Sequence, residues 1–210
     1  MPDALNSNSF FSLNKSLTFI TLCLSALLLL YVKKTFIEYE TAAFEFLQDR
    51  PEGAILRLIS TLQFVSIPVV FLWKFSVIGM VLWFGCFLFG YRITFSQCWS
   101  IVMAAEFVFI LPEIIKILWF LFIDTDPAYQ AIHAFYPLSL MNFFNFHNVP
   151  IQYHYPLKAI SLFELGYIYV MVRGVHFYSR RQQNAAWYIV CCSYIFIYLL
   201  WLIFYMVVYK

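Results

Sequence analysis

The sequence is short of charge, and this shortage decides its class first. Of its 210 residues only 11% are charged, whereas 63% are hydrophobic; soluble domains carry about 25% charged residues. The formal net charge is +2 and no basic run exceeds two residues, so nothing in the sequence indicates nucleic-acid binding. This composition excludes an ordinary soluble domain and favours a protein of the lipid bilayer.

Recognisable catalytic and ligand-binding motifs are also missing. The sequence contains no G-x-S-x-G, no H-E-x-x-H, no phosphate-binding G-x-x-x-x-G-K loop and no dinucleotide fingerprint. Its five cysteines show no C-x-x-C spacing and fall in or beside apolar segments, as small hydrophobic side chains do. We therefore expect neither an enzyme nor a cofactor nor a metal site.

What the sequence does contain is long apolar segments. A helix that spans a bilayer needs about 20 mostly apolar residues, and several segments approach or meet this length. They are residues 17–32, 55–73, 75–91, 100–123, 157–178 and 185–209. We predict an all-α, polytopic transmembrane helical bundle in a single domain over residues 1–210, with about six spans and with five as the alternative.

The second and third segments form one continuous apolar run with Lys74 near its centre. Such a run is too long for an ordinary single span. The sequence therefore predicts a tight hairpin, with the ammonium of Lys74 reaching the membrane surface at the turn. A single long helix with a buried Lys74 is the alternative.

Basic residues in the connections predict the orientation, because short cytoplasmic loops collect Lys and Arg. With six spans, the first, third and fifth connections hold Lys33, Lys34, Arg50, Arg92, Arg180 and Arg181. The long fourth connection, residues 124–156, contains no Lys or Arg. We therefore expect a multi-pass protein of the cytoplasmic (inner) membrane, with both termini and the 124–156 connection outside.

Residues 36–48 have the pattern of an amphipathic helix, which Pro51 and Gly53 stop. The polar face is acidic and includes Glu38 and Glu45, whereas helices that bind anionic lipid carry Lys and Arg there. We expect this helix at the cytoplasmic membrane surface. It either packs against the protein's own spans or presents a docking face to a basic partner.

Several ionisable residues fall inside the predicted spans, where a charge costs roughly 2.5–3.5 kcal/mol and usually pairs or serves a function. They are Glu106, Glu113, Lys116, Glu164 and Arg173. Glu113 and Lys116 are close enough in sequence for an intrahelical pair, and Glu106 or Glu164 can pair with a cation from another span. Two interpretations stay open, namely polar pairs that fix helix packing and a proton or ion path.

The last span carries a row of side chains, mostly aromatic, at alternating spacings of four and three residues, which places them along one side of a helix. The row includes Trp187, Cys191, Tyr194, Tyr198, Trp201 and Tyr205. Tyr and Trp usually gather at the two membrane interfaces, but the middle members of this row fall at mid-depth, where a hydroxyl or an indole N–H needs a partner. We expect this side of the helix to contact protein, of the same chain or of another.

Two stretches of the sequence share a layout of glycine-ended helices and short polar turns. In "VLWFGCFLFGYRITFSQCWSIVMAAEFVFILPEIIKIL", Gly85 and Gly90 lie at the end of a helix, "RITFSQ" forms a polar turn, and Pro112 falls inside the next helix. In "LFELGYIYVMVRGVHFYSRRQQNAAWYIV", a helix ends near Gly174 before a short polar turn and a last span.

From Gly79 to Lys210 this layout resembles the Yip (Ypt-interacting protein) family of small polytopic membrane proteins, in its bacterial form. The resemblance implies no catalysis. It implies action through protein partners in membrane trafficking or membrane organisation. Five spans are usual in that family, whereas this sequence predicts six.

The function expected from these observations is that of a non-enzymatic accessory or scaffold subunit of a larger membrane assembly, for example in protein export or membrane organisation. The expected partners are membrane lipids and other integral membrane proteins in a hetero-oligomeric complex, and no nucleic acid. The alternative is a small transporter or proton-coupled carrier that uses Glu106, Glu113 and Glu164. A lipid-modifying enzyme that uses His147 and His154 is a third alternative.

Overall fold

The structure is a computed structural model that describes residues 11, 14–38, 51–124, 132, 134–144, 149–179 and 183–209. These residues are mostly helical and contain no strand; one isolated antiparallel bridge joins Ser139 to Ser161. The all-α class predicted from the sequence is confirmed. The predicted amphipathic helix over residues 36–48 lies outside the described residues, apart from residues 36–38.

The described part of the chain forms six helical units and one short 3₁₀ turn. The units are α2 (Lys15–Lys33) with the π-helix η1 (Lys34–Glu38); α4 (Pro51–Leu88); α5 (Phe95–Glu106) with the 3₁₀ helix η2 (Phe107–Phe109) and α6 (Ile110–Phe122); α8 (Ile151–Ala159); α9 (Leu162–Ser179); and α10 (Gln183–Val190) with the π-helix η5 (Cys191–Ile195) and α11 (Phe196–Val208). The separate turn is η3 (Leu140–Phe143).

Three helices of the described chain are long and apolar enough to cross a membrane. They are Lys15–Ile37, Leu58–Leu88 and Gln183–Val208. Their outer faces carry large apolar side chains, such as Leu62, Val69 and Phe204, each more than half exposed. Exposed apolar surface of this extent suits lipid rather than water, which supports the predicted membrane protein.

Local sequence signals explain where two of the helices begin. At the start of α2 the side chain of Asn14 accepts a hydrogen bond from the Ser16 N–H. At the start of α5, Thr94 and Gln97 form a reciprocal capping box. The turn between α4 and α5 contains Gly90 with φ of +71°, a conformation that other residues adopt only with strain.

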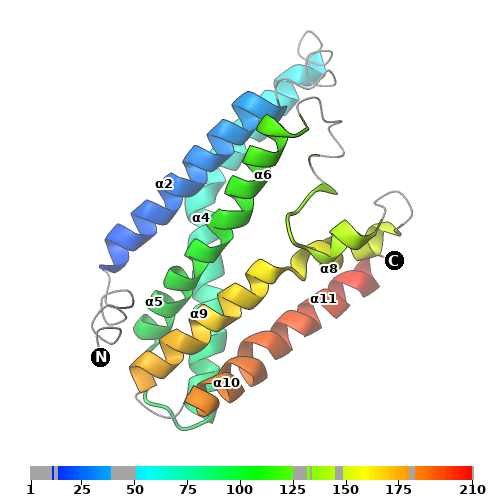
Figure 1. Ribbon diagram of the computed structural model, residues 1–210. Coiled ribbons are helices and arrows are strands. Elements are labelled where there is room, and N and C mark those ends of the chain that lie inside the picture. Colours follow the sequence, from blue (N-terminus) through cyan, green and yellow to red (C-terminus); the bar gives the residue numbers. More distant parts are fainter. Residues whose placement is uncertain are drawn as a thin grey trace.

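α4 is one continuous helix, so the predicted hairpin at Lys74 is wrong. The residues around this position, Trp73 and Phe75, are not the Gly, Pro, Asn or Asp that a tight turn favours. The ammonium of Lys74 does not serve a turn, because it pairs with Glu106 of α5. With that partner available the helix continues for about 57 Å and runs the length of the bundle (Figure 1).

The described chain crosses the bundle five times, because α4 crosses it only once (Figure 1). At one end Lys15, the first residue of α2, hydrogen-bonds Ser96 near the start of α5. At the opposite end Tyr155 of α8 packs against Tyr205 of α11. α2 therefore begins and α11 ends at opposite ends of the bundle, and the side of the membrane on which each terminus lies stays a prediction.

The orientation predicted from the basic residues assumed six spans, and it changes when the chain crosses the bundle five times. Lys33 and Lys34 end α2 at the α8 end of the bundle, whereas Arg92 lies in the turn between α4 and α5 at the other end (Figure 1). The connection from α9 to α10, whose sequence includes Arg180 and Arg181, joins helices at that other end too. Because basic residues occur at both ends, their count selects no cytoplasmic side, and the orientation stays a prediction.

The described parts of the 124–156 connection pack against the bundle. Ile132 is fully buried and belongs to a small apolar cluster with Ile117 of α6. The bridge between Ser139 and Ser161 ties the connection to the start of α9. The apolar side chains of these described parts therefore lie in contact with helices of the same chain.

The helix predicted over residues 100–123 is interrupted at its centre. α5 ends at Glu106, the 3₁₀ turn η2 follows, and α6 begins at Ile110. Pro112 has no backbone N–H with which to bond the carbonyl of Val108, and the chain tightens in the preceding turn. Glu106 consequently lies at the joint between two helical segments.

Two glycines allow close contacts between helices. A Cβ atom on Gly174 of α9 would lie 2.6 Å from Cγ2 of Ile101 in α5. A Cβ atom on Gly85 of α4 would lie 2.5 Å from Cβ of Ser193 in η5. Real Cβ atoms do not approach so closely, so these two helix contacts depend on glycine.

Gly174→Ala should destabilise the bundle, because an added methyl group in a packed interior costs roughly 1–3 kcal/mol. Gly79→Ala is the matched control, since its Cβ would meet Trp99 no closer than an ordinary 3.4 Å. Thermal unfolding in detergent should show a lower midpoint for Gly174→Ala and an unchanged or higher one for Gly79→Ala. Equal midpoints for the two variants would contradict the close approach of α9 to α5.

Candidate functional site

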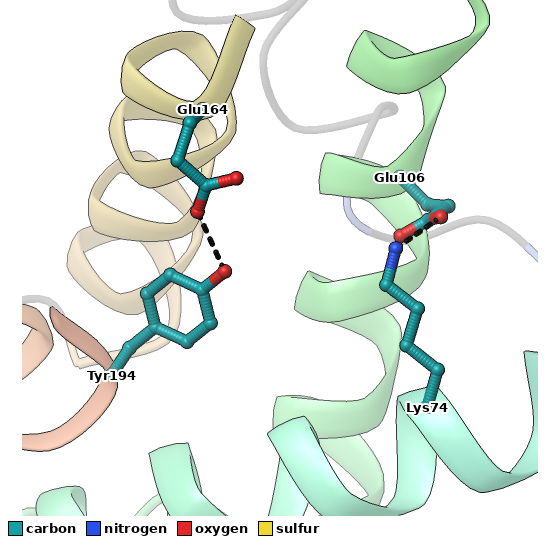
Figure 2. A network of polar contacts seen from close by, with 4 residues as sticks. All are labelled: Lys74, Glu106, Glu164 and Tyr194. Carbon is teal, nitrogen blue, oxygen red and sulfur yellow. Dashed lines mark hydrogen bonds and ion pairs between the residues drawn. The ribbon is translucent and has the colours of Figure 1, made fainter. Parts of the chain in front are cut away.

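A buried polar cluster lies where α4, α5, α9 and η5 meet, and it contains two bonded pairs (Figure 2). Nζ of Lys74 in α4 lies 2.7 Å from Oε1 of Glu106 in α5. The hydroxyl of Tyr194 in η5 donates to Oε1 of Glu164 in α9 over 2.7 Å. Together with Tyr167 of α9, these four residues are called the polar cluster below.

Aromatic rings surround the ammonium of the first pair. Nζ of Lys74 lies 4.7 Å from the ring centroid of Phe109 and 6.0 Å from that of Tyr167, within the range of cation–π attraction. Glu106 is only 5% exposed, whereas the side chain of Lys74 is 34% exposed. The sequence predicts that a cation from another helix pairs with Glu106 or Glu164. Lys74 is this cation, and it pairs with Glu106.

The second pair joins a carboxyl group to a phenol. Glu164 is buried, and among the described residues no ion pair links it to a cation. Tyr194 is buried as well, and its ring lies 5.5 Å from that of Tyr167 and 5.9 Å from that of Tyr198. Glu164 therefore lies among aromatic side chains, with a hydroxyl group in place of a counter-charge.

Tyr167 stands between the two pairs and is absent from the residues predicted from the sequence. It is fully buried, and in the described part of the chain its hydroxyl has no hydrogen-bond partner. The same holds for Oε2 of Glu106. Its position three residues after Glu164 could have indicated Tyr167, because residues i and i+3 share one face of a helix.

The other charged residues predicted for the site do not join the cluster. Lys116 is buried together with Pro112 on one side of α6, whereas Glu113 is half-buried at the edge of that side. No ion pair links Glu113 to Lys116 among the described side chains, so the predicted intrahelical pair is wrong. Arg173 is exposed on α9.

The row of aromatic residues predicted on the last span divides into two parts. Tyr194 and Tyr198 turn inward, and their partner is the same chain. Trp201 is 52% exposed and donates its indole N–H to the hydroxyl of Tyr155 over 3.4 Å, while Tyr205 packs on the Tyr155 ring. The π-helix η5 adds a residue to one turn, so the positions before and after it no longer share one side.

The 124–156 connection brings one more phenol close to the carboxylates. Burial, and to a smaller extent nearby carboxylate charge, raises the pKa of Tyr136. Its hydroxyl therefore stays protonated over the physiological range. The partner candidate Glu45 lies outside the described residues, and so does the side chain of Glu38.

The chemistry that this site offers is that of carboxyl groups, phenols and one ammonium. Within the described ranges, no group of three His, Cys, Asp or Glu side chains is arranged to hold a metal ion. The cluster can hold a proton or ordered water between its oxygen atoms. Comparison with known protein families, with curated proteins and with solved structures finds no match for this chain, so the resemblance to the Yip family stays a prediction.

Lys74→Met should destabilise the protein by about 3 kcal/mol, at the lower end of the range for a broken buried pair, because it leaves the Glu106 carboxylate buried without a counter-charge. The double variant Lys74→Met/Glu106→Gln should recover most of the loss, since it removes both charges. Thermal unfolding of the two variants in the same detergent checks this. A double variant no more stable than Lys74→Met would contradict the pairing.

Proposed function

We propose that this chain is a non-enzymatic integral membrane protein and serves as an accessory or scaffold subunit of a larger membrane assembly. One observation carries the proposal most directly. The buried ionisable side chains of the cluster find their partners within the chain, on neighbouring helices: Lys74 for Glu106 and Tyr194 for Glu164. Such pairs fix how helices pack, and each contributes little net stability.

The arrangement of the helices gives further support. With α4 as a single helix the described chain crosses the bundle five times, which is the usual number in the Yip family that the sequence resembles. That resemblance implies partners rather than catalysis. We propose that the partners are other integral membrane proteins, joined in a hetero-oligomeric complex and surrounded by lipid.

The outer side of the last helix carries the aromatic residues that the bundle leaves uncovered. Trp201 is 52% exposed and Tyr209 is 58% exposed, and both follow the buried Tyr194 on the same helical unit. Trp and Tyr dominate the energetics of protein contacts because they combine a large apolar area with a polar tip. Trp201 is the exposed contact candidate that remains from the predicted row, and the exposure of Tyr209 adds a second candidate that the row did not include.

Gentle detergent extraction of the protein with a tag after Lys210 should yield a stoichiometric complex with at least one other membrane protein. Native mass spectrometry of the purified species provides the measurement. Trp201→Ala should lower the yield of the complex, whereas Trp73→Ala, at a tryptophan on α4 that is even more exposed (74%), should leave it unchanged. A lone monomer or homodimer from the unaltered protein would count against an accessory subunit.

A second candidate function, a proton-coupled carrier, is favoured by the environment of Glu164. Carboxyl groups inside membrane proteins commonly belong to proton or ion pathways. Glu164 is buried and bonded to a phenol rather than to a described cation. It is therefore a better candidate for proton exchange than Glu106, which holds the Lys74 ammonium.

The carrier candidate predicts that purified protein in liposomes speeds the decay of an imposed pH gradient, read with a pH-sensitive dye inside the vesicles. Glu164→Gln should reduce this decay to the rate of protein-free liposomes. Asp124→Asn, at a carboxylate beyond the end of α6, is the control and should retain it. A pH gradient that decays no faster with the unaltered protein than in protein-free liposomes would exclude a carrier.

A further inference from the structure

The charges of the polar cluster do not balance if both carboxyl groups are ionised. Glu106 and Glu164 are 5% and 8% exposed, and among the described residues of the cluster the ammonium of Lys74 is the one cation. An uncompensated buried charge is strongly destabilising. One of the two carboxyl groups must therefore be neutral for the cluster to be neutral.

The geometry identifies which carboxyl group that is. Glu106 receives the ammonium of Lys74 at 2.7 Å, so a charge on this carboxyl group has its counter-charge. Glu164 receives only the hydroxyl of Tyr194, on the other side of the cluster in Figure 2. A phenol can also donate to the carbonyl oxygen of a protonated acid, so this contact requires no charge on Glu164.

We propose that Glu164 is the proton-binding site of this protein, held as a neutral carboxylic acid that releases and takes up one proton. On release, the O–H bond of the Glu164 carboxyl group breaks and the proton passes to water. The cluster then carries one net negative charge, with Lys74 still an ammonium. On uptake, the carboxylate takes the proton from a hydronium ion and neutrality returns.

Buried oxygen atoms without partners mark the same place. The hydroxyl of Tyr167 and Oε2 of Glu106 are both buried and have no hydrogen-bond partner in the described chain. The Tyr167 ring lies 6.0 Å from Nζ of Lys74 and 5.5 Å from the ring of Tyr194, which puts it between the two pairs. Unsatisfied buried oxygens are rare and costly, and an exchangeable proton with an ordered water would satisfy them.

The backbone is irregular on both sides of this place. Glu106 is the last residue of α5 before the 3₁₀ turn η2, and Tyr194 belongs to the π-helix η5. Single-turn π-helices and mid-helix 3₁₀ turns often occur at functional sites. Each irregular segment here brings one polar side chain of the cluster into position.

The groups that face Glu164 come from every element around it. They are Lys74 of α4, Glu106 of α5, Tyr167 of α9 itself, Tyr194 of η5, Tyr198 of α11 and Tyr136 of the 124–156 connection. Phenols remain protonated far above neutral pH, and Glu106 is paired. Glu164 is therefore the group of this set that is left to exchange a proton.

The proposal names the residue on which the carrier candidate rests, and its test reads the proton itself rather than flux. Infrared difference spectra of the purified protein over a pH series should show the carbonyl stretch of a buried protonated carboxyl group, which disappears as the pH rises. Glu164→Gln should lack this band, and the control Asp124→Asn, at a carboxylate beyond the end of α6, should retain it. A band unchanged in Glu164→Gln, or no band in the unaltered protein, overturns the proposal.

Tyr194→Phe keeps the proposal testable if Glu164→Gln does not fold. The Tyr194 hydroxyl stabilises the ionised carboxylate more than the neutral acid, so its removal should move the loss of the band to higher pH by about one unit. An unmoved midpoint overturns the proposal. If Glu164→Gln removes the band and the unaltered protein shows no proton flux, the result supports the proton site and rejects only the carrier.

Discussion

Lys74 requires a counter-charge inside the bundle, because it lies within the continuous apolar helix α4. No turn at this position brings its ammonium to the membrane surface. Glu106 provides that charge at 2.7 Å, and an unpaired charge at this depth would cost several kcal/mol. The pair joins α4 to α5 and so fixes how α4 is rotated about its axis. In that rotation Gly85 lies against Ser193 of η5, a contact that a turned helix could not make.

The irregular helical segments follow from the same requirement. In an apolar environment each polar side chain of the interior needs a partner from the protein, and a regular helix cannot turn every such side chain inward. The 3₁₀ turn after Glu106 and the π-helix that contains Tyr194 change the local rotation of their helices. These two segments lie at the polar cluster, where polar side chains of different helices meet, whereas the π-helix η1 contributes no residue to it.

The helical class and the membrane character could be predicted from the sequence, because low charge and long apolar segments depend on composition alone. The partners of the buried charges could not, since Lys74 and Glu106 are 32 residues apart and the pairing depends on how two helices meet. The hairpin prediction failed for the same reason: it treated Lys74 as a residue without an interior partner. Of the predicted row only Tyr194 and Tyr198 turn toward the same chain, whereas Trp187, Cys191 and Trp201 are exposed, because the π-helix within the row changes the helical periodicity on which the prediction relied.

Glu113 and Glu164 look equivalent in the sequence, because each is a single carboxyl group in an apolar helix. Their surroundings differ, so a charge has different structural consequences at the two positions. A charge on Glu113 lies at a half-buried edge of α6, where neighbouring groups can rearrange around it. A charge on Glu164 has to be accommodated by Tyr194, which belongs to η5, and η5 both packs on α4 at Gly85 and continues into α11 with the exposed Trp201. The protonation of Glu164 therefore acts on the contact that connects the interior to the outer face of the last helix. The same proton can serve either proposed function, by loosening a helix in a carrier or by changing the contact surface in an accessory subunit.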